Sequence, residues 1–155
     1  MKQKLKILMV DDHPFILQAY KNTLELFKPT EYEMTYFDGV NGKTGYEAIV
    51  NATTEYDIAL FDISIPEYPA ENIESGIDLA VLLKKTMPNC KIVLLTMHDD
   101  KMKFKYIQEH INPVGLVIKN DLDFKEFLVV IETIIEGEKY YSETILKMME
   151  EQNFS

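Results

Sequence analysis

The chain has 155 residues and a formal net charge of −10, and 46% of its residues are hydrophobic while 27% are charged. These values suit one globular domain with a core of ordinary size, and they exclude a chain that is disordered throughout. The excess of acidic residues also argues against direct binding to nucleic acid, because such binding depends mainly on Lys and Arg that neutralise phosphates.

No apolar run approaches the roughly 20 residues that span a bilayer, and the first residues lack the cleavage site of a signal peptide. We therefore expect a cytoplasmic protein that does not contact a membrane. Cys90 is the only cysteine, so no intrachain disulfide can form. Its place at the start of an apolar run predicts a buried thiol without a function.

Apolar runs of strand length alternate with segments of helical period along the whole chain. This alternation predicts an α/β fold with a parallel sheet, in one domain without an internal repeat. The strand-like runs cover residues 5–10, 33–37, 57–61, 91–95 and 114–118. The helical segments cover residues 14–27, 43–51, 77–87, 101–110 and 122–136.

Polar side chains follow four of the five strand-like runs. Asp11 and Asp12 follow the first run, Asp62 the third, Thr96 the fourth and Lys119 the fifth. In an open parallel sheet, chemistry gathers at the carboxyl ends of the strands. We therefore expect three carboxylates, one hydroxyl and one ammonium to converge at a single edge.

Three carboxylates that lie close together cannot all ionise at low cost unless a divalent cation offsets their repulsion. Oxygen ligands in small number suit Mg²⁺, which readily takes a phosphate oxygen as another ligand. One carboxylate can then act as the nucleophile that forms an acyl phosphate. Asp62 is the best candidate because it stands alone, whereas Asp11 and Asp12 are adjacent and can share the metal. Thr96 and Lys119 would stabilise charge on the phosphoryl oxygens.

Four segments in this order, ILMVDDHP, ALFDISIP, IVLLTMHDD and GLVIKND, resemble the signatures of response-regulator receiver domains. The resemblance implies a flavodoxin-like (CheY-like), doubly wound sheet of five parallel strands in the order 2-1-3-4-5, with helices on both faces. It also implies that Asp11, Asp12, Asp62 and the backbone carbonyl of Ser64 bind Mg²⁺. A histidine kinase or a phosphotransfer protein would donate the phosphoryl group to Asp62, and the domain would signal by changing shape and would not act as an enzyme on other substrates.

The segments DDHP and TMHDD are most similar to the subfamily in which a helix-turn-helix DNA-binding domain of the LuxR type follows the receiver. The resemblance then implies control of transcription through a domain that is absent from this chain. Residues 1–137 would form the receiver, and residues 138–155 a linker or an extra helix, so that the chain is a fragment or a stand-alone receiver. Homodimerisation is expected through the fourth helix, the fifth strand and the fifth helix.

The sequence departs from the family pattern at two places near the expected site. An acidic insertion at 66–75 delays the glycine that opens the third helix to Gly76, and it is expected to screen the pocket or contact a partner. Leu116 occupies a position that often holds an aromatic switch residue, which makes such a switch doubtful. His98 lies where the family tunes the lifetime of the phosphorylated state, with a solvated loop histidine as the alternative.

Three other function classes compete with the receiver for this sequence. A flavodoxin-like electron carrier needs hydroxyl and amide groups after the first strand, whereas DDHP would repel the flavin phosphate. A hydrolase of the haloacid-dehalogenase type separates two aspartates by one residue, and here the second position is His13. We expect His13 to open the first helix beside Pro14. A pseudo-receiver that acts only by binding would fail to bind Mg²⁺.

Overall fold

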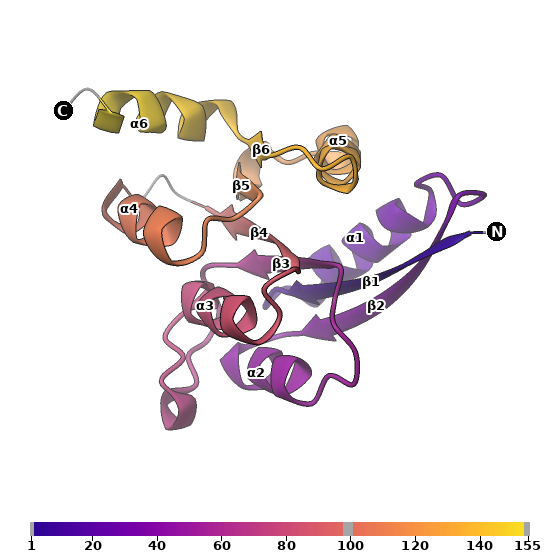
Figure 1. The fold of residues 1–155 in the computed structure, drawn as a ribbon, viewed down its shortest axis with the longest axis horizontal. Coiled ribbons are helices and arrows are strands. Elements are labelled where there is room, and N and C mark those ends of the chain that lie inside the picture. Colours follow the sequence, from indigo (N-terminus) through magenta and orange to yellow (C-terminus); the bar gives the residue numbers. More distant parts are fainter. Residues whose placement is uncertain (1, 98–100, 154–155) are drawn as a thin grey trace.

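A parallel sheet with helices on both faces makes up the computed structural model, which describes residues 2–97 and 101–153 (Figure 1). The strands are β1 (Gln3–Val10), β2 (Tyr32–Gly39), β3 (Ile58–Asp62), β4 (Lys91–Thr96), β5 (Gly115–Ile118) and β6 (Tyr140–Tyr141). The helices are α1 (Pro14–Glu25), α2 (Gly42–Val50), α3 (Gly76–Thr86), α4 (Lys101–His110), α5 (Phe124–Ile135) and α6 (Glu143–Asn153). Two 3₁₀ turns, η1 (Pro69–Glu71) and η2 (Lys119–Asp121), complete the described elements.

The strands lie in the order β2-β1-β3-β4-β5-β6, and all of these pairings are parallel. The predicted α/β class and the predicted order of five strands are confirmed. The sheet also has a sixth strand, because Tyr140 and Tyr141 pair with Gly115 and Leu116 of β5. A strand of two residues is too short to show any period in the sequence, which explains why five strands were predicted.

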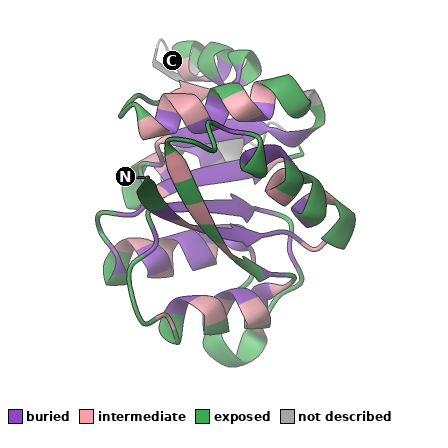
Figure 2. Ribbon diagram, turned by 90° about the vertical axis from the view of Figure 1, so that its right-hand side faces the viewer, coloured by how far each residue is buried: buried purple, intermediate pink, exposed green. Residues whose placement is uncertain are grey.

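Two apolar layers hold the helices on the sheet. The first layer packs α1 and α5 against one face, and the second packs α2, α3, α4 and α6 against the other. All five residues of β3 are buried, as expected for a central parallel strand that is covered on both faces. Figure 2 shows the same division, with buried strands between helices whose outer sides are exposed.

Residues 140–149, which we call the tail segment, fold back onto the sheet after α5. β6 lies along the outer edge of β5, and α6 places Ile145 and Met148 in the apolar layer, where they are 2% and 4% exposed. The tail is therefore part of the packed core. In the part of the chain that is described, no helix is both long and apolar enough to cross a membrane.

Candidate functional site

The predicted polar residues lie together where four parallel strands end. Asp62 is the last residue of β3 and pairs with Leu95, so Thr96 lies one residue beyond it on β4. Thr96 in turn pairs with Ile118, the residue before Lys119. Val10 of β1 pairs with Phe61 of β3, so Asp11 lies beside Asp62. The strand register thus brings the ends of β1, β3, β4 and β5 to one edge of the sheet, as the sequence predicted.

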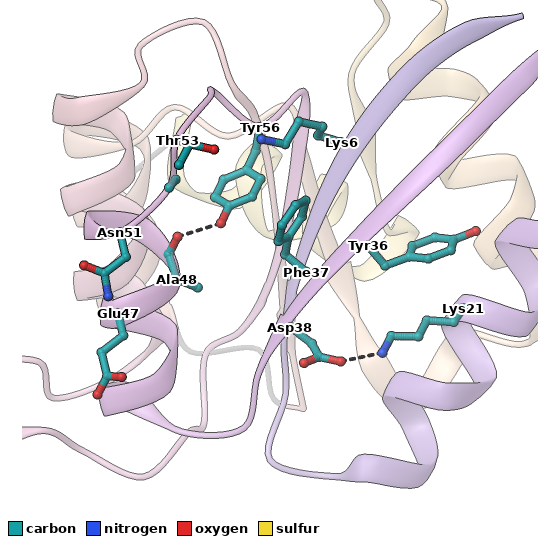
Figure 3. Close-up of a pocket in the computed structure, with 11 residues that line it drawn as sticks. Lys6, Lys21, Tyr36, Phe37, Asp38, Glu47, Ala48, Asn51, Thr53 and Tyr56 are labelled. Carbon is teal, nitrogen blue, oxygen red and sulfur yellow. Dashed lines mark hydrogen bonds and ion pairs between the residues drawn. The ribbon is translucent and has the colours of Figure 1, made fainter.

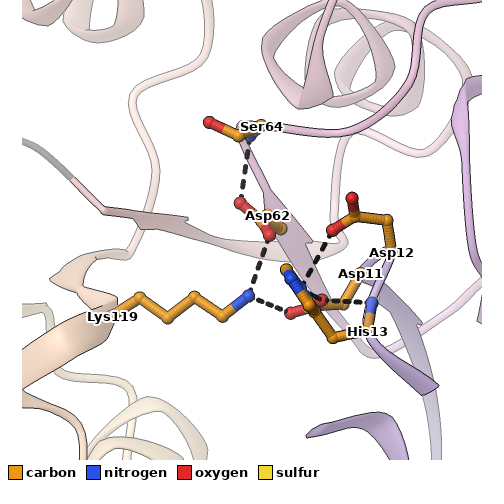
Figure 4. A network of polar contacts seen from close by, with 6 residues as sticks. All are labelled: Asp11, Asp12, His13, Asp62, Ser64 and Lys119. Carbon is orange, nitrogen blue, oxygen red and sulfur yellow. Dashed lines mark hydrogen bonds and ion pairs between the residues drawn. The ribbon is translucent and has the colours of Figure 1, made fainter. Parts of the chain in front are cut away.

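A buried ion-pair network occupies the centre of this edge (Figure 4). The Nζ of Lys119 lies 2.5 Å from Oδ2 of Asp11 and 2.9 Å from Oδ2 of Asp62. The second oxygen of Asp62 accepts a hydrogen bond of 3.0 Å from the backbone amide of Ser64. Asp11 and Asp62 are each only 1% exposed. Both oxygens of Asp62 are therefore held in a fixed orientation away from bulk water.

One ammonium serves two buried carboxylates in this network, and the pKa values reflect that imbalance. Burial raises the pKa of Asp62, and although Lys119 and the Ser64 amide counteract burial, they do not outweigh it; the charge of Asp11 raises the pKa further. Burial alone would lower the pKa of Lys119, but hydrogen bonds and charges from Asp11 and Asp62 outweigh burial and raise it. The site therefore holds a protonated lysine, and its carboxylates outnumber the positive charge that lies beside them.

The acidic residues fit a divalent cation. Ligand atoms of Asp11, Asp12, His13 and Asp62 all lie within 4.8 Å of one another. The Oδ1 atom of Asp12 is buried and lies 3.0 Å from Nδ1 of His13, an exposed ring that a cation could replace as the partner of this oxygen. Carboxylate oxygens are the ligands that Mg²⁺ prefers. The site could thus bind a metal, while the role of the Ser64 carbonyl stays a prediction.

The ring of His13 is the feature of this site that the sequence did not predict. His13 does precede α1, with Pro14 at the first helical position, as expected. Its Nδ1, however, lies 2.8 Å from Oδ1 of Asp11 and 3.0 Å from Oδ1 of Asp12. The side chain is 59% exposed, so it can move aside for a cation without disturbing the core. Its position beside Asp12 was the only available signal in the sequence.

Comparison with known proteins identifies the family. The sequence matches the response regulator receiver domain family over residues 7–120, which is most of the chain. The chain belongs to this family. The transcriptional regulatory protein MctR of Rhizobium johnstonii is 30% identical over 143 residues, which cover 91% of this chain and 60% of MctR. The oxygen regulatory protein NreC of Staphylococcus aureus is 30% identical over 138 residues, which cover 88% of this chain and 57% of NreC.

Solved structures share the receiver fold. A two-component response regulator of the LuxR family from Aurantimonas sp. SI85-9A1 superposes with a TM-score of 0.75 at 22% identity, covering 99% of this chain and 100% of its own. The isolated receiver domain of RcsB from Salmonella enterica serovar Typhimurium, in the presence of the phosphomimetic BeF₃⁻, also gives 0.75, at 17% identity and coverages of 94% and 99%. The receiver chain described here spans about three fifths of the length of MctR and NreC.

Gly76 fixes how closely α3 approaches the receiver's central aspartate. The helix begins at Gly76, as the sequence predicted, and the Gly76 amide donates to the carbonyl of Ile63 at 2.9 Å. A Cβ atom at this position would lie 2.1 Å from the backbone oxygen of Asp62. A side chain therefore cannot fit here unless the backbone of Asp62 moves, which explains why the glycine is required.

The acidic insertion at 66–75 is folded and anchored beside the site. Tyr68 and Ile73 exchange two backbone hydrogen bonds of 2.7 and 3.1 Å, and Ile73 is 5% exposed. The amide of Gly42 at the start of α2 donates to the carbonyl of Pro66 at 2.8 Å. Its proposed roles in screening the pocket or contacting a partner stay predictions.

The two other residues singled out in the sequence lie on β5 and after β4. Leu116 is 2% exposed and belongs to the same apolar layer as Ile145 and Met148 of α6. An aliphatic side chain thus fills the position at which many relatives are expected to carry an aromatic switch. His98 lies outside the described residues, so its predicted role stays a prediction.

A cavity of about 640 Å³ lies apart from the receiver's acidic site, between β2, α2 and the loop before β3 (Figure 3). None of the residues predicted for the site lines it. Lys21 and Asp38 in this cavity form an ion pair with each other, and Lys6 lies over the rings of Phe37 and Tyr56. Because Lys21 and Asp38 already pair with each other, we assign the chemistry to the strand ends and not to this cavity.

Proposed function

We propose that this receiver domain accepts a phosphoryl group on Asp62 from a histidine kinase or a phosphotransfer protein. The ammonium of Lys119, which donates to both Asp62 and Asp11, carries this proposal, because it supplies positive charge beside the carboxylate that would receive the phosphoryl group. Asp62 stands at the end of a central strand with both oxygens oriented, whereas Asp11 is engaged by Lys119 and His13.

The proposed transfer is a displacement at phosphorus. An oxygen of Asp62 forms the new bond to phosphorus, the bond to the donor's imidazole nitrogen breaks, and that nitrogen keeps the electron pair. Lys119 and Thr96 would then interact with the phosphoryl oxygens. Mg²⁺, held by Asp11, Asp12, Asp62 and the Ser64 carbonyl, would neutralise charge on the carboxylates and the phosphoryl group.

Intact mass measured after incubation with acetyl phosphate tests this proposal. We expect the gain of one phosphoryl group when Mg²⁺ is present, no gain with a chelator, and no gain for Asp62→Asn, because an amide cannot form the acyl phosphate. Phosphate retained by Asp62→Asn would refute the assignment. A folded wild-type protein without any gain would indicate a receiver that signals only by binding, and sustained hydrolysis of phosphate esters would indicate an enzyme.

The output is proposed from the relatives. MctR and NreC are named as regulatory proteins, and each extends well beyond the region matched by this chain. We propose that phosphorylation controls transcription through a LuxR-type DNA-binding domain that is not among these 155 residues. Binding of DNA would reside in that domain, because the receiver carries a net charge of −10 and would repel phosphates.

Dimerisation through α4, β5 and α5 also stays a proposal. In the described chain, β6 pairs along the outer edge of β5 and α6 packs in the layer that contains α4. A second copy that approached this face would therefore meet the tail segment as well as α4 and α5. The tail segment must then move aside or take part in the dimer contact.

A further inference from the structure

The tail segment lies outside the residues that match the receiver family, which end at residue 120. It nevertheless contacts β5, the strand that leads to Lys119, through backbone hydrogen bonds and apolar packing. The amides of Tyr140 and Ser142 donate to the carbonyls of Val114 and Leu116 at 2.8 and 3.0 Å. The side chains of Ile145 and Met148 share the apolar layer that holds Leu116.

Ser142 makes the contact nearest to the active edge. The backbone amide of Ile118 donates a hydrogen bond of 2.8 Å to Oγ of Ser142, 24 residues later in the chain. Ser142 directly precedes α6, where a serine oxygen usually accepts from the first amides of its own helix. Here the oxygen holds the last residue of β5, and Ser142 is only 8% exposed.

Ile118, whose amide makes this hydrogen bond, directly precedes Lys119 in the chain. Lys119 reaches Asp11 and Asp62 only if the end of β5 keeps its place, since its Nζ lies 2.5 and 2.9 Å from their oxygens. On the inner side, β4 holds Ile118 through its pairing with Thr96. On the outer side, Ser142 is the group that binds the Ile118 amide. The tail segment thus forms one of the two supports of the strand end that carries Lys119.

We propose that Ser142 is a positioning residue for Lys119, and that docking of the tail segment on β5 and phosphorylation of Asp62 favour each other. This inference rests on the function proposed above. If docking improves the contact of Lys119 with a phosphoryl group, then a bound phosphoryl group must strengthen docking by the same factor. A chain that continues beyond the tail segment would receive the signal through this contact.

Hydrogen–deuterium exchange of the full chain tests the coupling directly. Exchange in residues 115–118 and 140–143 is compared with Mg²⁺ alone and with Mg²⁺ plus beryllofluoride as the phosphoryl mimic. We expect beryllofluoride to slow exchange in both segments by up to about tenfold, the factor that corresponds to one hydrogen bond of typical net strength. Unchanged or faster exchange would overturn the proposal.

Substitution of Ser142 provides a second test that does not depend on exchange. Calorimetric titration with beryllofluoride at saturating Mg²⁺ should show weaker binding to Ser142→Ala, by about three- to tenfold. Ser142→Thr keeps the hydroxyl and should restore the affinity. Thr133→Ala removes a hydroxyl of α5 that donates to Val129 at 2.7 Å in an exposed hydrogen bond, and should leave binding unchanged.

A merely structural role for Ser142 would give a different result. Ser142→Ala would then unfold at a lower temperature, yet the folded protein would bind beryllofluoride as tightly as the wild type, and this outcome would refute the inference. The same measurements separate failure of the proposed function from failure of this inference. If wild-type protein neither gains mass with acetyl phosphate nor binds beryllofluoride, both proposals fall, whereas normal phosphorylation with no effect of Ser142→Ala removes only the inference.

Discussion

Lys119 carries one positive charge between two buried carboxylates, and this imbalance determines the chemistry of the individual residues. Asp11 and Asp62 each accept a hydrogen bond from its ammonium, while Asp12 adds a third carboxylate, whose buried oxygen lies 3.0 Å from Nδ1 of His13. A buried charge without full compensation is costly to the fold. The site therefore holds an excess of negative charge in a form that a cation or the loss of one carboxylate would relieve.

Asp62→Asn should therefore stabilise the metal-free protein while it abolishes phosphorylation. The amide keeps the size of the side chain but removes one buried negative charge, so we expect the free energy of unfolding to rise by on the order of 1 kcal/mol. Urea unfolding in the presence of a chelator measures the change. Asp38→Asn is the matched control at a partly exposed pair with Lys21 and should change stability by about 0.5 kcal/mol or less. A less stable Asp62→Asn protein would contradict this account of the site.

Steric contact with the end of β3 determines where the helix α3 begins. The Cβ of an alanine at Gly76 would collide with the backbone oxygen of Asp62 at 2.1 Å, and backbone cannot rotate away as a side chain can. The site aspartate and the first turn of α3 therefore cannot move independently. This contact explains why a glycine follows the insertion even though the insertion delays it.

Gly76→Ala should destabilise the fold by at least about 2 kcal/mol, because a forced shift of backbone costs more than the helix propensity of alanine returns. The same shift moves Asp62, so phosphorylation by acetyl phosphate should slow as well. Gly45→Ala is the matched control, since its Cβ would meet the flexible end of Leu79 at 2.6 Å, and it should cost less. Equal losses for both variants, measured by urea unfolding, would argue against a special role for Gly76.

The sequence predicted these elements well and the contacts between them only in part. Alternating apolar runs located β1 to β5 and α1 to α5, because long periodic segments are governed by burial. The two residues of β6 carry no such period, and they form a strand only because the edge of β5 is open to them. The contacts of His13 with Asp11 and of Ser142 with Ile118 depend on three-dimensional placement, which spacing along the chain does not reveal.

For the whole molecule, a divalent cation at the acidic edge should act as a stabilising ligand. The chain has a net charge of −10, and the two carboxylates that are buried among the described residues, Asp11 and Asp62, meet at one edge of the sheet. A ligand that binds only the folded state stabilises it by about 2.7 kcal/mol at a hundred times its dissociation constant. For a chain of this length, that gain corresponds to a rise in the melting temperature of roughly 5–10 °C.

Thermal unfolding with Mg²⁺, with chelator and with NaCl at equal ionic strength measures this effect. Screening of the overall negative charge would act alike for both salts, whereas a bound cation makes Mg²⁺ alone raise the melting temperature strongly. Asp12→Asn should remove most of the Mg²⁺-specific part, because it withdraws one of the three carboxylates that would bind the ion. Equal shifts with Mg²⁺ and NaCl would mean that the acidic edge binds no cation. Lys119, without a metal ion, would then have to stabilise the charge that develops when Asp62 is phosphorylated.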